Sequence, residues 1–224
     1  MAIIKFWRTC FIAVLSAVGA GAMAAEDPAA QLRAAAAQGE TARVRELLAR
    51  GAPLEARDAQ GNTALLRATQ GNHAETARAL IEAGAAVNAQ NQMQDSAYLL
   101  AGAQGYREIL ELTLRHGADL KSTNRYGGTA LIPACERGHV DVVKTLLAAG
   151  VDPNHVNRLG WTGLLEAIIL SDGGPRHQEI VALLIEGGAD VNLADGDGRT
   201  PLAHARQRGQ RATVQLLERA GARE

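Results

Sequence analysis

Residues 127–154, "GGTALIPACERGHVDVVKTLLAAGVDPN", decide the fold of this 224-residue chain. Thr129 is a good N-cap for a first helix, which Gly138 ends, and Gly150 ends a second helix. The turn-forming residues "VDPN" follow. The stretch therefore predicts two helices and a projecting turn, a unit too small to bury its own apolar face. That face is formed by Leu131 and Ala134 in the first helix and by Val142, Val143, Leu146 and Leu147 in the second.

The same unit recurs along the chain at a fixed period. The hydroxyl residues that begin the units lie 33 residues apart, with one step of 38, and the glycines that close the units follow the same spacing with the same exception. Two independent markers with one period indicate a stacked repeat array, in which each unit covers the apolar face of its neighbour. The first marker comprises Thr63, Ser96, Thr129, Thr162 and Thr200, and the second comprises Gly51, Gly84, Gly117, Gly150, Gly188 and Gly221.

This pattern resembles the ankyrin repeat family. The matching residues are G-x-T-x-L, then G-H, then V-V-x-x-L-L-x-x-G-A-x-x-N, and they cover about residues 28–221. The resemblance implies a protein-binding module, since arrays of this family usually bind proteins and share no catalytic activity. It also implies an all-α solenoid of about six helix–turn–helix repeats with β-hairpin loops, within a domain of residues 25–224. The repeats would lie at about residues 28–57, 58–90, 91–123, 124–156, 157–194 and 195–221.

Several copies depart from the pattern. The first has no hairpin and the last is rich in polar residues, so we expect these two copies to cap the ends of the array. In the third copy Gln94 replaces the hairpin glycine, which predicts a distorted turn. The fifth copy holds the five extra residues, within "LSDGGPRHQE", residues 170–179. No strand precedes them and no lysine or G-x-G-x-x-G pattern accompanies them. We therefore interpret them as a loop insertion, although a specific contact there stays open.

The first 24 residues predict a signal peptide. Lys5 and Arg8 precede an apolar run over residues 11–21, and small residues then stand at Ala22 and Ala24. This order is that of a secretory leader, which we expect to be cleaved after Ala24. The alternative is an uncleaved membrane anchor, for which the run is only marginally long. The predicted localisation is periplasmic or secreted, in a Gram-negative bacterium.

Composition supports helices and excludes several classes of site. Apolar residues make up 47% of the chain but aromatic residues only 3%, so alanine and leucine dominate, which suits packed helices. Cleavage would leave 21 basic and 24 acidic residues, a formal charge of −3, with no basic footprint for nucleic acid. No later segment is apolar enough to span a membrane. No metal-ligand spacing or cofactor motif is present, and we expect a monomer with one buried, unreactive thiol at Cys135.

The hairpin tips of the fourth and fifth copies are the first candidate binding surface. Every tip begins at an Asp or Asn, and the residues beyond it vary from copy to copy. Arg, Tyr and Trp are the residue types enriched at interface hot spots, and they gather in these two tips. The alternative is that Trp161 packs between hairpins and that the arginines are solvated. The candidate contact residues are Arg125, Tyr126, Arg158, Leu159 and Trp161.

A variable column in the first helices is the second candidate surface. It contains Arg67, Glu166 and His204, which the resemblance places on the concave side of the array. Glu166 and His204 could form an acid–base pair, but no nucleophile or oxyanion site accompanies them. The sequence therefore predicts a non-catalytic module that binds an unidentified protein. The alternatives are an enzyme or small-ligand binder that uses Glu166, His204 and the loop of the fifth copy, and an effector or immunity-type partner.

Overall fold

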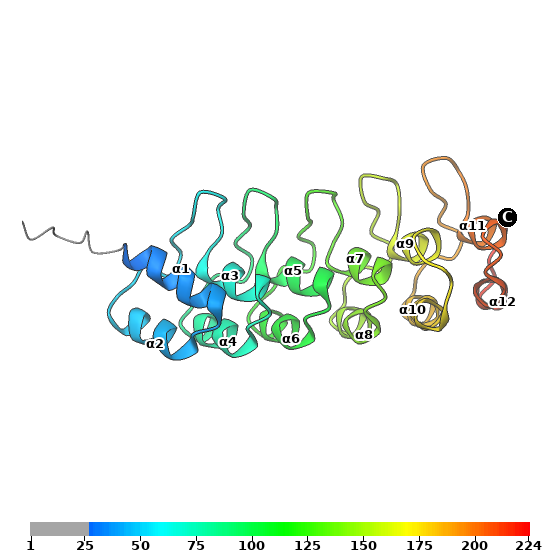
Figure 1. Ribbon diagram of the computed structural model, residues 1–224. Coiled ribbons are helices and arrows are strands. Elements are labelled where there is room, and N and C mark those ends of the chain that lie inside the picture. The colour runs from blue at the N-terminus through cyan, green and yellow to red at the C-terminus, as the bar shows by residue number, and fades with distance from the viewer. Residues whose placement is uncertain (1–26) are drawn as a thin grey trace, which may run out of the picture.

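The computed structural model describes residues 27–224, so the predicted signal peptide and its cleavage site at Ala24 lie outside the described residues. Within this range the chain is an all-helical array, in which twelve helices pair into six repeats that stack in a row (Figure 1). The solenoid predicted from the repeat period is confirmed. The helices are α1 (Pro28–Gln38), α2 (Thr41–Ala49), α3 (Ala64–Gln70), α4 (Ala74–Glu82), α5 (Ala97–Gln104), α6 (Arg107–Arg115), α7 (Leu131–Glu136), α8 (Val140–Ala148), α9 (Gly163–Ile169), α10 (Pro175–Glu186), α11 (Pro201–Gln207) and α12 (Arg211–Arg219).

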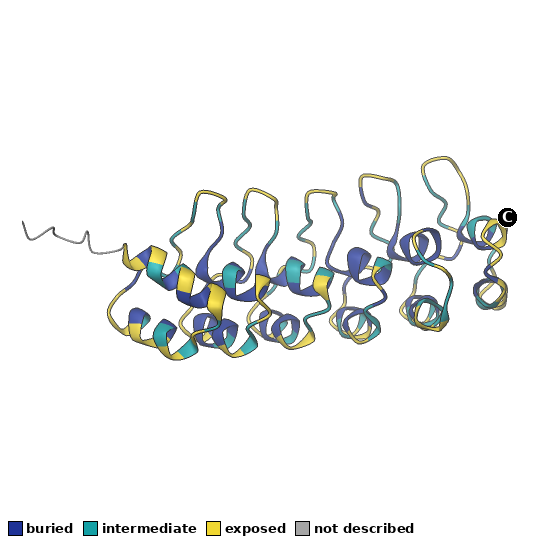
Figure 2. Ribbon diagram, viewed as in Figure 1, coloured by how far each residue is buried: buried dark blue, intermediate teal, exposed yellow. Residues whose placement is uncertain are grey.

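Two parallel layers of helices run along the array. The first helix of each repeat packs on the first helix of the next, from α1 to α11, and the second helices pack in the same way from α2 to α12. Five loops project from the side of the first helices (Figure 1), and their tips are exposed (Figure 2). Residues 27–224 contain no β-strand, so these loops are hairpins closed by a tight turn without a β-ladder.

The N-caps of the first helices follow the sequence prediction with one exception. The side-chain oxygens of Thr63, Ser96, Thr162 and Thr200 each accept a backbone N–H three residues later, at 3.2 Å. Thr129 makes no such bond, and its buried hydroxyl has no partner in the structure. Pro133 has no N–H to bond the Thr129 carbonyl, so the first backbone bond of the helix is missing there. The helix α7 accordingly begins at Leu131, and the predicted cap at Thr129 is wrong.

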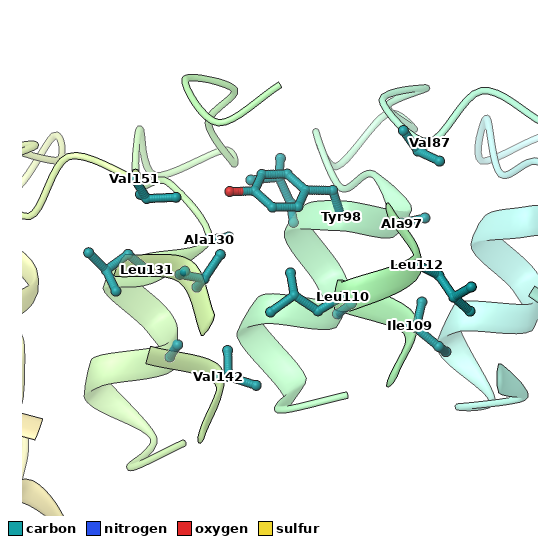
Figure 3. Packing of buried hydrophobic residues seen from close by; sticks show 14 of the residues in the cluster. Val87, Ala97, Tyr98, Ile109, Leu110, Leu112, Ala130, Leu131, Val142 and Val151 are labelled. Atoms are coloured by element: carbon teal, nitrogen blue, oxygen red, sulfur yellow. The ribbon is translucent and has the colours of Figure 1, made fainter. Parts of the chain in front are cut away.

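The core lies between the repeats and is built from small and medium aliphatic side chains. Leu110, Leu131 and Val142 are buried where repeats three and four meet (Figure 3). Tyr98 is fully buried at the position that holds a leucine in the neighbouring repeats, and its hydroxyl has no hydrogen-bond partner. Burial raises the pKa of this phenol. Each interface between repeats therefore buries apolar surface that one repeat could not bury alone.

The size of facing side chains is matched from one repeat to the next. A Cβ added at Gly102 of α5 would lie 2.7 Å from the Cβ of Ala130 in the following repeat. One repeat further along, the larger Cys135 faces Gly163, where an added Cβ would lie 3.1 Å from the Cys135 sulfur. Because each pair contains a glycine, the helices approach closely at both interfaces. Burial raises the pKa of the Cys135 thiol, as expected for an unreactive cysteine.

The hairpin turn of repeat three keeps the geometry of its neighbours, contrary to the prediction of a distorted turn. Gln94 adopts a positive φ of 58°, and its N–H bonds the Asn91 carbonyl at 3.0 Å. The glycines Gly61 and Gly127 hold the same position with φ of 81° and 73°. Gln94 therefore carries the backbone strain that glycine avoids, because its Cβ crowds the following carbonyl.

Replacement of Gln94 by glycine is expected to raise the free energy of unfolding by about 1 kcal/mol, since the strain of a left-handed non-glycine residue is removed. Urea unfolding followed by circular dichroism measures this change. Asn72 has a φ of 54° and is the matched control, because asparagine tolerates this region and should gain less from glycine. Equal gains at the two positions would contradict the assignment of strain to Gln94.

The insertion in repeat five contacts repeat six through Ser171 and Gly173. Part of the insertion lengthens α10, because this helix begins at Pro175, two residues before His177. Gln210, which is buried in repeat six, donates from its side chain to the carbonyls of Ile168 at 2.9 Å and Ser171 at 3.3 Å. A Cβ at Gly173 would lie 2.6 Å from Gln210. The insertion therefore forms a loop between α9 and α10, as predicted, and it also makes the specific contact that the sequence left open.

Candidate functional site

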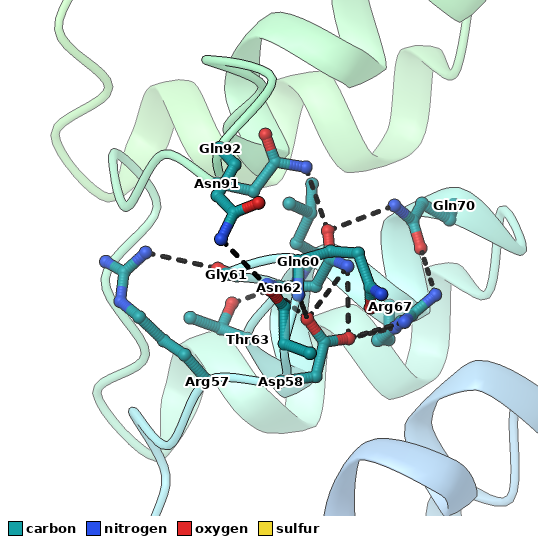
Figure 4. A network of polar contacts seen from close by, with 12 residues as sticks. Arg57, Asp58, Gln60, Gly61, Asn62, Thr63, Arg67, Gln70, Asn91 and Gln92 are labelled. Carbon is teal, nitrogen blue, oxygen red and sulfur yellow. Dashed lines mark hydrogen bonds and ion pairs between the residues drawn. The ribbon is translucent and has the colours of Figure 1, made fainter.

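Each hairpin begins at an Asp or Asn whose side chain holds the turn together. Figure 4 shows this arrangement in repeat two, where Oδ1 of Asp58 accepts the backbone N–H groups of Gln60 at 2.9 Å and Asn62 at 2.8 Å. The same carboxylate pairs with Arg67 of α3. Burial alone would raise the pKa of Asp58, but the hydrogen bonds from Asn62, Arg67 and Gln60 lower it to about 2. The Asp58 side chain thus fixes the turn and ties it to α3 of the same repeat.

Neighbouring hairpins are joined to one another by hydrogen bonds. The backbone N–H of Gln92 donates to the Gln60 carbonyl at 3.1 Å, and that of Arg158 donates to the Tyr126 carbonyl at 2.9 Å. The guanidinium of Arg158 also donates to the Arg125 carbonyl at 2.7 Å. Arg158 therefore bridges the hairpins of repeats four and five, and its predicted role as a partner contact stays a prediction.

Arg67, Glu166 and His204 of the variable column each contact the Asp or Asn that begins the hairpin of the same repeat. Arg67 pairs with Asp58, and His204 lies 2.7 Å from the carboxylate of Asp195. Glu166 accepts a hydrogen bond of 2.7 Å from the amide of Asn157. A basic column residue thus faces an aspartate, and the acidic one faces an asparagine. The predicted concave residues Arg67, Glu166 and His204 are anchors of their own hairpins.

Glu166 and His204, the acid and the base that the sequence suggested as a pair, have different hydrogen-bond partners. The hydrogen-bonded partner of His204 is Asp195, and the partner of Glu166 is Asn157. Burial raises the pKa of Glu166 to about 7, and the nearby Glu136 adds to the rise, whereas the bond from Asn157 opposes it. The proton of Glu166 is therefore controlled by its burial and by Glu136.

A groove lies between the hairpin tips and first helices of repeats four and five. Its volume is about 320 Å³. Tyr126, Leu159 and Leu170 line it, with exposed fractions of 55%, 59% and 48%, and they are three of the five large apolar side chains that are exposed in residues 27–224. Glu166 lies in the lining with only 6% of its surface exposed. The groove combines an apolar rim with a buried carboxyl group.

The groove brings together residues of both candidate surfaces. From the hairpin set it includes Arg125, Tyr126 and Leu159, and from the column it includes Glu166. Trp161 is half-buried and is not part of the lining, so its predicted role as a partner contact stays a prediction. Arg67 and His204 lie in other repeats. Residues of the lining that the sequence analysis did not select are Asn124, Gly128, Ile132, Pro133, Glu136, Arg137, Asn157 and Leu170.

Residues 27–224 show neither a metal-binding cluster nor a membrane-spanning helix. No group of three or more histidine, cysteine, aspartate or glutamate side chains in this range is arranged to hold a metal ion. No helix in the same range has the length and apolarity that a membrane span requires.

The comparisons with known proteins agree with the repeat architecture. A family profile described as "Ankyrin repeats (3 copies)" matches residues 14–91, 98–195 and 149–223. A solved ankyrin repeat domain from Acinetobacter baumannii AYE is 60% identical, with a TM-score of 0.84, over 86% of this chain and 98% of that chain. The solved ankyrin repeat protein EF0377 is 44% identical, with a TM-score of 0.82, over 85% of this chain and 97% of that chain.

One curated relative is similar over a shorter segment. YahD of Escherichia coli (strain K12), named as an ankyrin repeat protein, is 55% identical over 58 residues. This segment is 26% of the present chain and 29% of that relative, so the match spans less than a third of the relative's length.

Proposed function

Because the chain belongs to the ankyrin repeat family, whose arrays are generally protein–protein interaction modules, we propose that it holds a partner protein in the periplasm without catalysis. The groove between repeats four and five carries this proposal. Exposed apolar side chains that gather at one place on a solenoid are the usual mark of a binding surface. The hairpins beside the groove are fixed by hydrogen bonds, so a partner would meet a preformed surface.

The catalytic alternative receives no support from the geometry. It needed Glu166, His204 and the loop of repeat five to act together. Glu166 and His204 each engage the hairpin of their own repeat, and the repeat-five loop engages Gln210. An acid, a base and a loop that serve three separate structural contacts do not form a reacting site.

Replacement of Tyr126 and Leu159 by alanine is expected to weaken binding of the partner about tenfold, because both side chains are exposed in the groove and would be buried on binding. The partner is first captured from periplasmic extract with the native chain as bait, and calorimetry then measures its affinity. Met93→Ala is the matched control, since Met93 is exposed at the neighbouring hairpin of repeat three. Arg158→Ala is a poorer test than the sequence indicated, because it also removes a bond between hairpins. Unchanged affinity in a folded double variant would exclude this surface.

Export is expected to leave a mature N-terminus near Ala25. The motivation is the order of Lys5, Arg8, the apolar run and Ala24 in the sequence. Mass spectrometry of the native protein, purified from separate periplasmic and cytoplasmic fractions, measures the terminus. A full-length chain confined to the cytoplasm would contradict the periplasmic proposal.

A further inference from the structure

The groove of repeats four and five holds two carboxylates that have little to neutralise them. Glu136 makes no side-chain hydrogen bond or ion pair with any described residue, and Glu166 is bonded through one oxygen only, to Asn157. Each lines the groove, and after burial the charge of Glu136 is the second cause of the raised pKa of Glu166. A cation placed between the two groups would relieve this repulsion.

The two cations in the same lining are already engaged. The guanidinium of Arg125 lies 4.7 Å from the centre of the Tyr126 ring. Burial raises the pKa of Asp95 in the preceding hairpin, and the charge of Arg125 opposes this rise. Arg137 donates to the carbonyl of Ala103 at 2.9 Å. Neither is held in an ion pair with Glu136 or Glu166. The two carboxyl groups therefore have no ion-pair partner in the part of the chain that the structure describes.

The column residue of repeat four is Pro133, which lines the groove. In repeat two the equivalent residue is Arg67, whose long side chain reaches Asp58. Proline is short and has no polar atom in its side chain, so it leaves Asn124 without a column partner. Oδ1 of Asn124 accepts two backbone N–H groups of its own turn, from Tyr126 and Gly128, while its amide nitrogen has no partner among the described residues. A free amide donor thus lines the same groove as the two carboxylates.

From these contacts we propose that the groove binds a lysine or arginine side chain from an extended segment of a partner protein. The cationic end lies between Glu136 and Glu166, and apolar neighbours in the segment pack on Tyr126, Leu159 and Leu170. The amide of Asn124 donates to a backbone carbonyl of the segment. This proposal rests on the proposed function, because it states which chemistry the partner presents to the same groove.

The two carboxylates, the apolar rim and the free amide donor together favour a peptide segment as the occupant of the groove. Two carboxylates match one basic group, and the long methylene stem of lysine or arginine suits an apolar rim. The free amide donor needs an acceptor that a backbone carbonyl supplies. Extended segments present all three features at successive positions, with side chains alternating in direction.

A pair of peptides that differ only in charge tests the proposal. The probes are acetyl-Ala-Leu-Arg-Leu-Ala-amide and the same peptide with citrulline, which keeps the shape of arginine but is neutral. Both are titrated to millimolar concentration into the full 224-residue chain labelled with ¹⁵N. The side-chain amide signals of Asn124 and Asn157 report on the groove, and the backbone spectrum shows that each variant is folded. We expect the arginine peptide to bind about tenfold more tightly than the citrulline peptide.

The variants separate the cationic contact from the apolar one. Glu136→Gln and Glu166→Gln are expected to reduce the preference for arginine to about twofold, because each removes one charge and keeps the shape. Leu159→Ala is expected to weaken both peptides equally, and Met93→Ala is expected to change neither. Equal affinity for the two peptides, an unchanged preference in both glutamine variants, no perturbation of the groove signals, or perturbed signals elsewhere would each overturn the proposal.

These outcomes are distinct from a failure of the proposed function. If the two peptides perturb the groove equally, the cationic preference is wrong and the groove remains a protein-binding surface. If the captured partner binds the Tyr126 and Leu159 double variant with unchanged affinity, the proposed function fails at this surface whatever the peptides do.

Discussion

Replacing Gly102 by cysteine is expected to lower the free energy of unfolding by about 3 kcal/mol, the upper range for overpacking a close-packed interior. A Cβ at this position would lie 2.7 Å from the Cβ and 3.2 Å from the carbonyl oxygen of Ala130, which is fully buried. Because one of these atoms is backbone, α5 and α7 must move apart. The contact joins repeats three and four, so the loss would also uncouple the two halves of the array.

The second variant of this test copies the next interface. Cys135 fits against Gly163, so Gly102→Cys combined with Ala130→Gly reproduces a pair that the chain already contains. The combination is expected to recover a large part of the loss, with a coupling energy of about 1–3 kcal/mol. Urea unfolding under reducing conditions measures all three variants, and Gln104→Val, exposed on the same helix, is the control. Additive effects of the two changes would contradict the matching of sizes between repeats.

Replacing Glu166 by glutamine is expected to stabilise the protein by about 2 kcal/mol at pH 8 and to have little effect at pH 4. The pKa of this carboxyl is raised from 4.5 to about 7, first by burial and then by Glu136. Between these values the folded chain retains a proton that the unfolded chain has released, so stability falls as the pH rises through this window. Glutamine keeps the bond from Asn157 and carries no charge. Because Glu166 lines an open groove, water offsets part of the cost.

The measurement is the free energy of unfolding of both proteins across this pH range. The difference between them should grow as the pH rises from 4.5 to 7 and then become constant. The same change at the exposed Glu82 is the control and should alter stability by less than about 0.5 kcal/mol. A difference that does not depend on pH would show that Glu166 is not the group that titrates.

The fold could be predicted from the sequence because its two markers are local. A hydroxyl residue at a helix start and a glycine at a helix end each act within one turn of backbone, and most copies of both keep those roles in the structure. The exceptions are local as well. At Thr129 the helix starts late, because Pro133 four residues later has no N–H to bond the Thr129 carbonyl. Gln94 kept its turn because Asn91 and the neighbouring hairpins hold the backbone in place.

The groove could not be predicted in the same way, because its residues come from four separate segments of the chain. Tyr126 and Leu159 stood out as exposed tips, but Leu170 had the same character as the buried residues before it in α9. Glu136 and Pro133 gave no signal of their own, since their importance depends on which neighbours lack a partner. The pairing of the column with the hairpin was visible in the sequence, where Asp58 and Asp195 accompany a base and Asn157 an acid. It was missed because each column was considered alone.

That pairing determines where repeats can be exchanged by recombination. Arg67 follows Asp58 by nine positions within one unit, and Glu166 follows Asn157 by the same interval. A crossover between the hairpin tip and the first helix would join a donor's aspartate to a recipient's glutamate and leave two acids facing each other. A crossover after the second helix transfers both partners together. The unit that can be exchanged without separating these partners therefore begins at the Asp or Asn of the turn. We expect duplication or shuffling of repeats to be tolerated best at that boundary.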